Sequence, residues 1–230
     1  MRNLIFVLSV LLSLQAPAQN RWFSLYSDST ALKNDARNIV HQFTEKVKTS
    51  NSSIKLDDWI VVKNTTPYLI YIEKKNVNLP FWTEVIPQQK DFFTEVSGSE
   101  KQGKEVFGLF FNGFYLVHEL GHGLAESAGR NFTNAFDSEY DANIVAILYW
   151  KASKGEKNLK KCHAYAKKML AHLKNPVPAN ENYKEYITQH YNELSSDPYK
   201  YGYIQFSQFV EIYENKKLPD FETFIKTYGK

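Results

Sequence analysis

Residues 104–128, KEVFGLFFNGFYLVHELGHGLAESA, decide how this chain is organised. Apolar side chains occupy almost every turn of this stretch, and Gly129 directly after it is of a residue type that commonly ends helices. The pattern predicts one long helix that is buried on most of its surface. Because glycine and asparagine interrupt the apolar run, which then leads into His118 and Glu119, it does not predict a membrane span.

Amphipathic helices are predicted on both sides of this buried helix, because apolar residues recur there at intervals of three and four. Pro176, Pro178 and Pro198 separate the later helices from one another. The predicted amphipathic helices cover residues 30–48, 137–151, 157–174, 181–195, 203–215 and 220–228.

Two short runs of β-branched and aromatic residues, 59–62 and 68–72, flank a turn-rich connector and predict an antiparallel hairpin. Residues 81–86, between Pro80 and Pro87, predict a third short strand at an edge of the sheet, where a missing N–H group costs little. The predicted order is a helix, a small antiparallel sheet, and helices to the end. This order is typical of an α+β fold in which the N-terminal helix and the sheet pack on a mainly helical core.

The composition excludes several classes of protein. With 43% hydrophobic residues and a net charge of only +3, from 28 Lys+Arg against 25 Asp+Glu, the chain is too apolar for a disordered protein. Its charges are too evenly mixed for a nucleic-acid-binding face, so no nucleic acid partner is expected. The single cysteine, Cys162, cannot form an internal disulfide or a cysteine-rich metal site, so histidines and carboxylates must hold any metal ion.

The N-terminus has the pattern of a secretory signal peptide. Residues 1–18, MRNLIFVLSVLLSLQAPA, place Arg2 before an apolar run and end in an Ala-x-Ala site at Ala18. The run is shorter than the roughly 20 residues that span a bilayer. We therefore expect export to the periplasm or the cell exterior, no stable membrane span after the signal is removed, and a single domain over residues 19–230, since no repeat or linker divides them.

The buried helix contains the strongest functional signal of the sequence, His118-Glu119-Leu120-Gly121-His122. Residues four apart lie on one face of a helix, so both imidazoles can reach one ion, while the glutamate points to the side where water on that ion would lie. A His-Glu pair is costly to bury among apolar residues unless something satisfies it. A zinc ion would do so.

A third ligand is expected from the next predicted helix, where Glu139 and Asn143 share one face. Glu139 can therefore supply a carboxylate from a neighbouring helix. Asp137, Asp141 and Glu126 are the rival third ligands. Asp141 points about 200° around the helix from Glu139, and Glu126 lies two turns along the helix axis, so both fit one ion less well.

The HExxH sequence and the downstream segment 139–146, EYDANIVA, together resemble the gluzincin metallopeptidases, and in particular the ExxAN variant of ImmA/IrrE-type and HtpX-type proteins. The resemblance covers residues 105–150. It implies a zincin-like core with Glu119 as the general base. It also implies that one zinc ion is held by His118, His122 and Glu139.

The same resemblance implies that Asn143 hydrogen-bonds a ligand histidine. It places the active-site helices at about residues 104–151, followed by a C-terminal helical part at residues 157–228. The metzincin pattern does not apply, because Ala125 and Ala128 stand where that pattern has a glycine and a third histidine.

The function expected from the resemblance is a secreted zinc peptidase that acts on a peptide or protein substrate, with zinc activating water and Glu119 moving its proton. The alternative is a non-catalytic module of zincin-like fold, stabilised by zinc or degenerate, that binds a partner. Catalysis also needs a donor that stabilises the oxyanion. The candidates in the predicted C-terminal helices are Tyr186, His190, Tyr201 and Tyr203.

Overall fold

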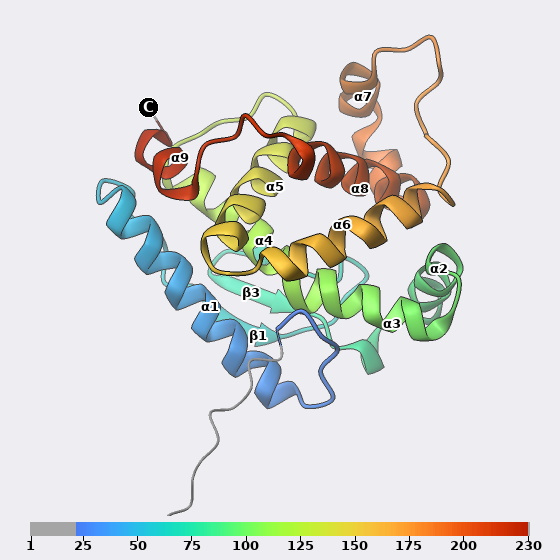
Figure 1. Ribbon diagram of the computed structural model, residues 1–230, viewed down its shortest axis with the longest axis horizontal. Helices are drawn as coiled ribbons and strands as arrows, with labels where there is room; N and C mark the ends of the chain where they lie inside the picture. The colour runs from blue at the N-terminus through green and yellow to red at the C-terminus, as the bar shows by residue number, and fades with distance from the viewer. Residues whose placement is uncertain (1–21, 230) are drawn as a thin grey trace, which may run out of the picture.

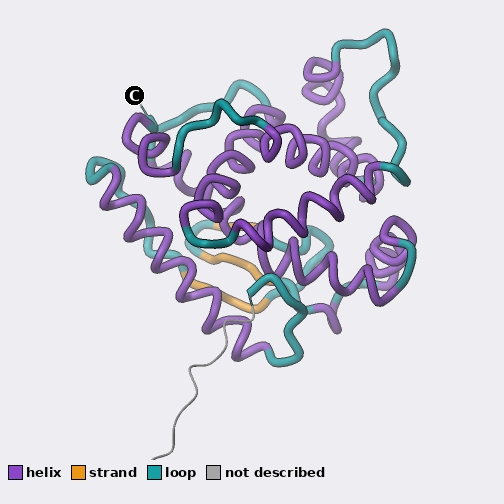
Figure 2. The backbone as a smooth tube through the Cα atoms, viewed as in Figure 1, coloured by secondary structure: helices purple, strands orange, loops and turns teal. Residues whose placement is uncertain are grey.

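The computed structural model of this chain describes residues 22–229, so the expected signal peptide at residues 1–18 lies outside the described part. The described chain is mainly helical with one small sheet, which confirms the α+β prediction (Figures 1 and 2). Its α-helices are α1 (Ser29–Ser50), α2 (Pro87–Ser97), α3 (Glu100–Leu109), α4 (Tyr115–Ser127), α5 (Ala135–Ala152), α6 (Glu156–Leu170), α7 (Tyr183–Ser196), α8 (Pro198–Glu214) and α9 (Phe221–Thr227).

The sheet is mixed, and the prediction of a small antiparallel sheet is wrong in this respect. Its central strand is β3 (Asn76–Leu79), which runs parallel to β1 (Ile60–Lys63) and antiparallel to β2 (Tyr71–Glu73). The hairpin predicted between residues 59–62 and 68–72 does not form, because β1 and β2 each pair with β3 and not with each other.

The strand β3 has the sequence Asn-Val-Asn-Leu. The sequence patterns did not predict it as a strand, because asparagine is depleted in strands. Its apolar residues nevertheless organise the sheet. Val77 is fully buried and lies opposite both Val61 on β1 and Ile72 on β2. The apolar run before β2 is a turn instead of a strand, since Leu69 has a left-handed backbone with φ of 64°.

The strand predicted at residues 81–86 is also wrong. Residues Trp82–Glu84 form one 3-10 turn, and Pro87 is the first residue of α2. Proline fits this position because the first N–H groups of a helix have no partner within the helix. The sequence patterns did not predict α2, which packs against α3 at one end of the molecule (Figure 1).

The long helix predicted over residues 104–128 is divided by a wide turn. Between α3 and α4, residues Phe110–Phe114 form a π-helical segment in which Asn112 has non-helical φ and ψ of −108° and 27°. Such a turn leaves backbone carbonyl groups without their usual helical partners. The interruption coincides with the Asn-Gly pair in the sequence, and Gly113 allows a close contact at this point.

The first residues of the described chain satisfy these carbonyl groups. The backbone N–H of Phe23 donates to the carbonyl oxygen of Asn112 at 2.8 Å. The indole N–H of Trp22 donates to the carbonyl oxygen of Gly113 at 2.9 Å. Both aromatic side chains are buried, so the N-terminal segment forms part of the core and supports the helix that carries His118.

The other predicted helices are confirmed, with ends that differ by a few residues. The helix α8 begins at Pro198 instead of residue 203, again because proline suits the first turn. The helix α6 ends at Leu170 instead of residue 174. No helix within residues 22–229 is long and apolar enough to cross a membrane.

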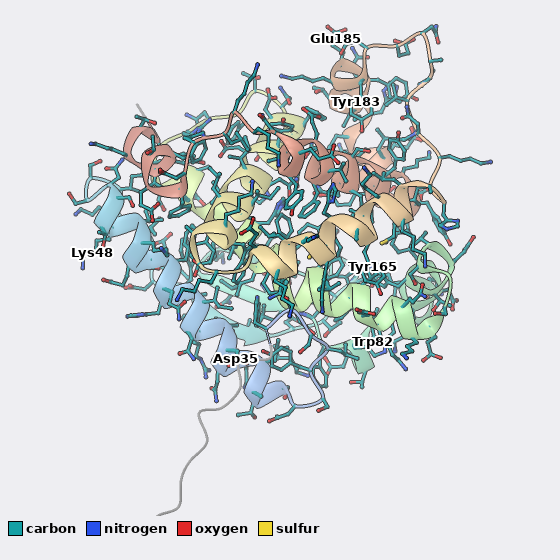
Figure 3. The ribbon with its side chains drawn as sticks, viewed as in Figure 1. Asp35, Lys48, Trp82, Tyr165, Tyr183 and Glu185 are labelled. Atoms are coloured by element: carbon teal, nitrogen blue, oxygen red, sulfur yellow. The ribbon has the colours of Figure 1, made fainter. Side chains whose placement is uncertain are left out.

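Most buried apolar side chains form one continuous, aromatic-rich core between the helices (Figure 3). Its largest fully buried members include Phe43 of α1, Phe107 of α3 and Tyr149 of α5. A second, smaller cluster contains Ile187 of α7 and Ile204 of α8. This second cluster holds α7 at the periphery of the molecule, beside the helices of the site.

The substitution Gly108→Ala tests the contact between α3 and the N-terminal segment. A Cβ atom at position 108 would lie 2.5 Å from the backbone nitrogen of Leu25 and 2.7 Å from the carbonyl carbon of Ser24. The segment must move to make room, so we expect the free energy of unfolding, measured in urea, to fall by about 1–3 kcal/mol.

Helix propensity alone predicts the opposite sign for this substitution, a gain of about 1 kcal/mol. A stabilised Gly108→Ala variant would therefore contradict the contact. The control is Lys101→Ala on the exposed side of the same helix, for which we expect a change within about 0.5 kcal/mol.

Candidate metal centre

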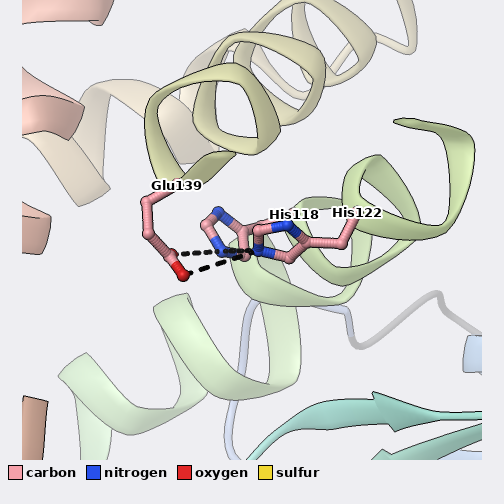
Figure 4. A group of neighbouring side chains, drawn as sticks. All are labelled: His118, His122 and Glu139. Carbon is pink, nitrogen blue, oxygen red and sulfur yellow. Dashed lines mark hydrogen bonds and ion pairs between the residues drawn. The ribbon is translucent and has the colours of Figure 1, made fainter. Parts of the chain in front are cut away.

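The candidate site lies between α4 and α5, and small residues bring these two helices together. A Cβ atom added to Gly121 of α4 would lie only 3.0 Å from the Cα atom of Ala142 of α5. A larger residue at position 121 would hold the helices apart. Their close approach places Glu139 of α5 beside His118 and His122 of α4 (Figure 4).

The metal-ligand atoms of the three side chains lie 3.2 to 3.7 Å from one another. The Nε2 atom of His118 lies 3.2 Å from Nε2 of His122 and 3.2 Å from Oε2 of Glu139. The Nε2 atom of His122 lies 3.7 Å from Oε1 of Glu139. The side chains of His118, His122 and Glu139 are 4%, 28% and 12% exposed, so the group is largely enclosed and could hold a metal ion.

These separations fit a tetrahedral ion. Ligand atoms at about 2.0–2.1 Å from zinc lie about 3.3–3.4 Å apart when the angles are tetrahedral. Each of the three separations, 3.2, 3.2 and 3.7 Å, is within a few tenths of an ångström of this value. The three donor atoms therefore need little rearrangement to bind one ion, and three protein ligands leave a fourth position for another molecule.

The charges of the group are paired in the absence of metal. Burial alone would raise the pKa of Glu139, but hydrogen bonds with His118 and His122 outweigh burial and hold it well below its usual range. Burial alone would lower the pKa of His122, but the hydrogen bond and negative charge of Glu139 raise it to about 9. His122 and Glu139 thus form an ion pair, which avoids the cost of an unpaired buried charge.

A chain of side-chain amides connects Glu139 back to His118. Gln205 Nε2 donates to Glu139 Oε2 at 2.7 Å, and Asn143 Nδ2 donates to Gln205 Oε1 at 3.3 Å. Nδ1 of His118 then donates to Asn143 Oδ1 at 2.9 Å. The first bond sets the direction of the others, because a carboxylate only accepts and Gln205 must present its NH₂ group to it.

The tautomer of His118 follows from this chain. When the ring carries one proton, the bond to Asn143 keeps it on Nδ1, and the lone pair of Nε2 then faces His122 and Glu139, as metal binding requires. The hydrogen bond expected between Asn143 and a candidate ligand histidine is thus present.

The remaining N–H groups of the amides are also used. Gln205 Nε2 donates a second bond to the hydroxyl of Tyr201 at 2.9 Å, and Asn143 Nδ2 donates to Gln208 Oε1 at 3.1 Å. Gln208 Nε2 donates to the carbonyl oxygen of Phe136 at 3.3 Å. Hydrogen bonds that link buried amides in this way hold the members of the network in one arrangement.

Two further contacts hold the carboxylate and the second histidine. The hydroxyl of Tyr191 on α7 donates to Oε1 of Glu139 at 3.0 Å. The hydroxyl oxygen of Ser138 lies 3.2 Å from Nδ1 of His122. His118 and His122 therefore each have a partner at Nδ1, and the carboxylate of Glu139 has partners at both oxygens. These contacts limit the rotation of all three side chains.

The contributions of Tyr191, Gln205 and Gln208 were missed by the sequence analysis. No fixed spacing relates these residues on α7 and α8 to the motif on α4. One signal was available, because both glutamines interrupt an apolar segment of α8 that includes Ile204 and Phe209. A glutamine buried in such a segment must have a hydrogen-bonding partner.

Glu119 lies beside the three converging side chains and is not one of them. Its carboxylate accepts the backbone N–H of Ile72 on β2. Burial raises its pKa, and the nearby charges of His118 and His122 offset only part of that increase. A carboxyl group with a raised pKa is suited to taking up and returning a proton near neutral pH.

The rival third ligands have other partners or lie outside the group. Asp141 pairs with Arg130 at 3.0 Å, and Asp137 pairs with Lys184 at 2.7 Å. Glu126 is exposed on the last turn of α4. Among the described residues, the one cluster of His, Cys, Asp and Glu with metal-ligand spacing is formed by the three residues at the crossing of α4 and α5.

A cavity of about 690 Å³ opens onto the group, and Glu119 also lines it. Of the four candidates for an oxyanion-stabilising donor, Tyr201 lines this cavity. Tyr186 and His190 instead stack on each other with ring centroids 4.1 Å apart, and Tyr203 packs against the apolar core. The structure thus reduces the four sequence candidates to one that can contact a bound molecule in this cavity.

No protein-family model matches this chain, and no curated protein or solved structure matches it. Two imidazoles and a carboxylate with an open fourth position, beside a separate glutamate in one cavity, make an arrangement suited to metal-assisted hydrolysis.

The substitution Gln205→Leu tests whether the amide chain orients the group. It removes a donor to Glu139 and the acceptor for Asn143, so His118 loses its fixed orientation. We expect zinc affinity, measured by competition with a chromophoric chelator, to fall by about 10–100-fold. The matched control is Gln42→Leu on the exposed face of α1, and equal affinities of the two variants would contradict the role of the chain.

Proposed function

We propose that this chain is an exported zinc metallopeptidase in which His118, His122 and Glu139 hold one zinc ion and Glu119 is the general base. One observation carries the proposal. Three ligand-type atoms, 3.2 to 3.7 Å apart, share a cavity with a glutamate that is not part of their cluster. The HExxH and ExxAN sequences that provide these residues resemble those of gluzincin peptidases.

The donor set supports zinc over other common ions. Imidazole nitrogen suits zinc and other transition metals, whereas calcium and magnesium prefer sites made entirely of oxygen. Zinc prefers four-coordinate tetrahedral sites, and catalytic zinc sites commonly have three protein ligands and one open position. When bound, zinc would supply a Lewis acid that acidifies water and polarises a carbonyl group.

Glu119 is suited to proton transfer in peptide hydrolysis. Its carboxylate lines the cavity, and burial raises its pKa above that of an exposed glutamate. In the proposed reaction, it takes a proton from the attacking water and delivers it to the leaving amine.

Tyr201 is the proposed donor to the oxyanion. Its hydroxyl oxygen accepts a hydrogen bond from Gln205 at 2.9 Å, and its own proton has a long contact, 3.5 Å, with the hydroxyl oxygen of Tyr191. The proton of the Tyr191 hydroxyl, in contrast, is donated to Glu139. The 3.5 Å contact of Tyr201 is weaker than the 3.0 Å bond from Tyr191 to a carboxylate, so Tyr201 is the better placed of these two tyrosines to turn its proton toward a bound oxyanion.

The location of the enzyme follows from the N-terminal sequence. The charged start, short apolar run and Ala-x-Ala site at residues 1–18 support export, which places the proposed substrates in the periplasm or outside the cell.

The substitution Glu119→Gln tests the proposed reaction. The amide keeps the size of the side chain but cannot accept the proton, so we expect hydrolysis of a quenched fluorescent peptide library to fall by at least about 100-fold. Zinc content, measured by elemental analysis, should remain at the wild-type value, because Glu119 is outside the ligand group.

A Glu119→Gln variant with full activity would overturn the assignment of the general base. A wild-type protein that binds zinc, unfolds when zinc is removed and cleaves no peptide of the library would instead favour a non-catalytic binding module stabilised by the metal.

The pair Tyr201→Phe and Tyr203→Phe tests the proposed oxyanion donor. Each removes one hydroxyl from α8, but the side chain of Tyr201 lines the cavity and that of Tyr203 packs against the core. For Tyr201→Phe we expect kcat to fall by about 10²–10³-fold with unchanged zinc content. Equal kcat values for the two variants would contradict this role.

A further inference from the structure

The cavity beside the candidate metal centre is larger than the reacting groups require. Its volume is about 690 Å³, within the range of sites that enclose a substantial part of a ligand. The loop before β2, the start of α2, the π-helical turn with α4, and α8 all contribute to its lining. A bound molecule would therefore be contacted by several elements at once.

The lining is almost free of charge away from the candidate metal centre. Within residues 22–229, the only carboxyl, imidazole, ammonium or guanidinium side chains that line the cavity are those of His118, Glu119, His122 and Glu139. The remaining lining consists of aromatic and aliphatic side chains with a few neutral polar ones. A charged group placed against this lining would lose its hydration without gaining a partner.

The apolar lining begins directly at the candidate metal centre. The ring of Tyr115 packs edge-on against His118 with centroids 5.4 Å apart. Phe111 follows at 5.0 Å from Tyr115, and Phe93 at 5.5 Å from Phe111. These three rings form a continuous aromatic wall that leads away from His118, and all three line the cavity.

Apolar side chains also stand exposed at the cavity. Tyr68 is 80% exposed and Ile86 is 39% exposed, and both contribute to the lining. Exposed apolar residues next to a site often mark a surface that a ligand covers. A third exposed residue, Ile60 on β1, is 57% exposed and does not line the cavity, which makes it useful as a control.

We propose that this cavity selects peptide substrates with a large apolar side chain, such as phenylalanine or leucine, next to the bond that is cleaved. The proposal rests on the function proposed above and adds its specificity. The aromatic wall starts at His118, so the side chain that it receives belongs to a residue adjoining the reacting carbonyl group.

The expected preference is large. Burying an apolar side chain of this size is worth about 10–100-fold in binding, and a charged side chain is penalised in addition. We therefore expect kcat/KM for a phenylalanine peptide to exceed that for the corresponding lysine or glutamate peptide by about 100-fold or more.

The test uses alanine-rich quenched peptides with Phe, Leu, Ala, Lys or Glu on either side of the cleaved bond, with the cleavage position located by mass spectrometry. Binding of the Phe and Lys peptides to zinc-loaded Glu119→Gln protein, measured by calorimetry, gives a readout without turnover. Tighter binding of the Phe peptide by about tenfold or more is the expected result.

The matched variants Ile86→Lys and Ile60→Lys place the same charge on two exposed isoleucines. The first lines the cavity and the second lies outside it. We expect Ile86→Lys to reduce the preference for Phe over Glu by about tenfold, in both kcat/KM and binding, because the new ammonium group can pair with the glutamate. Ile60→Lys should leave the preference unchanged.

The outcomes distinguish a wrong specificity from a wrong assignment of peptidase activity. Cleavage of all peptides at similar rates, or equal effects of the two lysine variants, would overturn the specificity and leave the peptidase in place. Selective binding of the Phe peptide without any cleavage would support the apolar cavity and contradict the peptidase.

Discussion

The close contact between Gly121 and Ala142 is the constraint on which the site depends. It lets α4 and α5 approach until Glu139 lies 3.2 Å from His118, a separation suited to two ligands of one ion. Any side chain at position 121 would have to displace the backbone of α5. The motif therefore provides more than its histidines and glutamate, because its glycine positions the helix that carries the third side chain.

The electrostatics of the site follow from this geometry. Three ionisable side chains are enclosed together, and each of them is neutralised or hydrogen-bonded by the others or by the amides of Asn143 and Gln205. The bonds run in one direction from Glu139 to His118, so the carboxylate of one helix determines which nitrogen of the other helix carries the proton. The same enclosure leaves Glu119 outside the group, where its raised pKa suits proton transfer.

Sequence patterns could predict the elements whose signals are local. The amphipathic helices and the HExxH spacing depend on residues within one or two turns. Glu139 was expected from the face of a single helix, and the contact of Asn143 with a histidine from the resemblance to gluzincins. Two features depend on tertiary contacts and could not be predicted from local patterns. They are the pairing of β3, whose asparagines are unfavourable in strands, and the π-helical turn. Tyr191 and Gln205 reach the site from α7 and α8, and only packing brings them there.

The metal content of the purified protein shows directly whether side chains from α4 and α5 form one metal site. Elemental analysis of the wild type beside His122→Ala and Glu139→Ala should find about one zinc per chain, lost in both variants, as expected for a site with three protein ligands. A wild-type protein without metal after reconstitution, or a Glu139→Ala variant that keeps its zinc, would contradict the account.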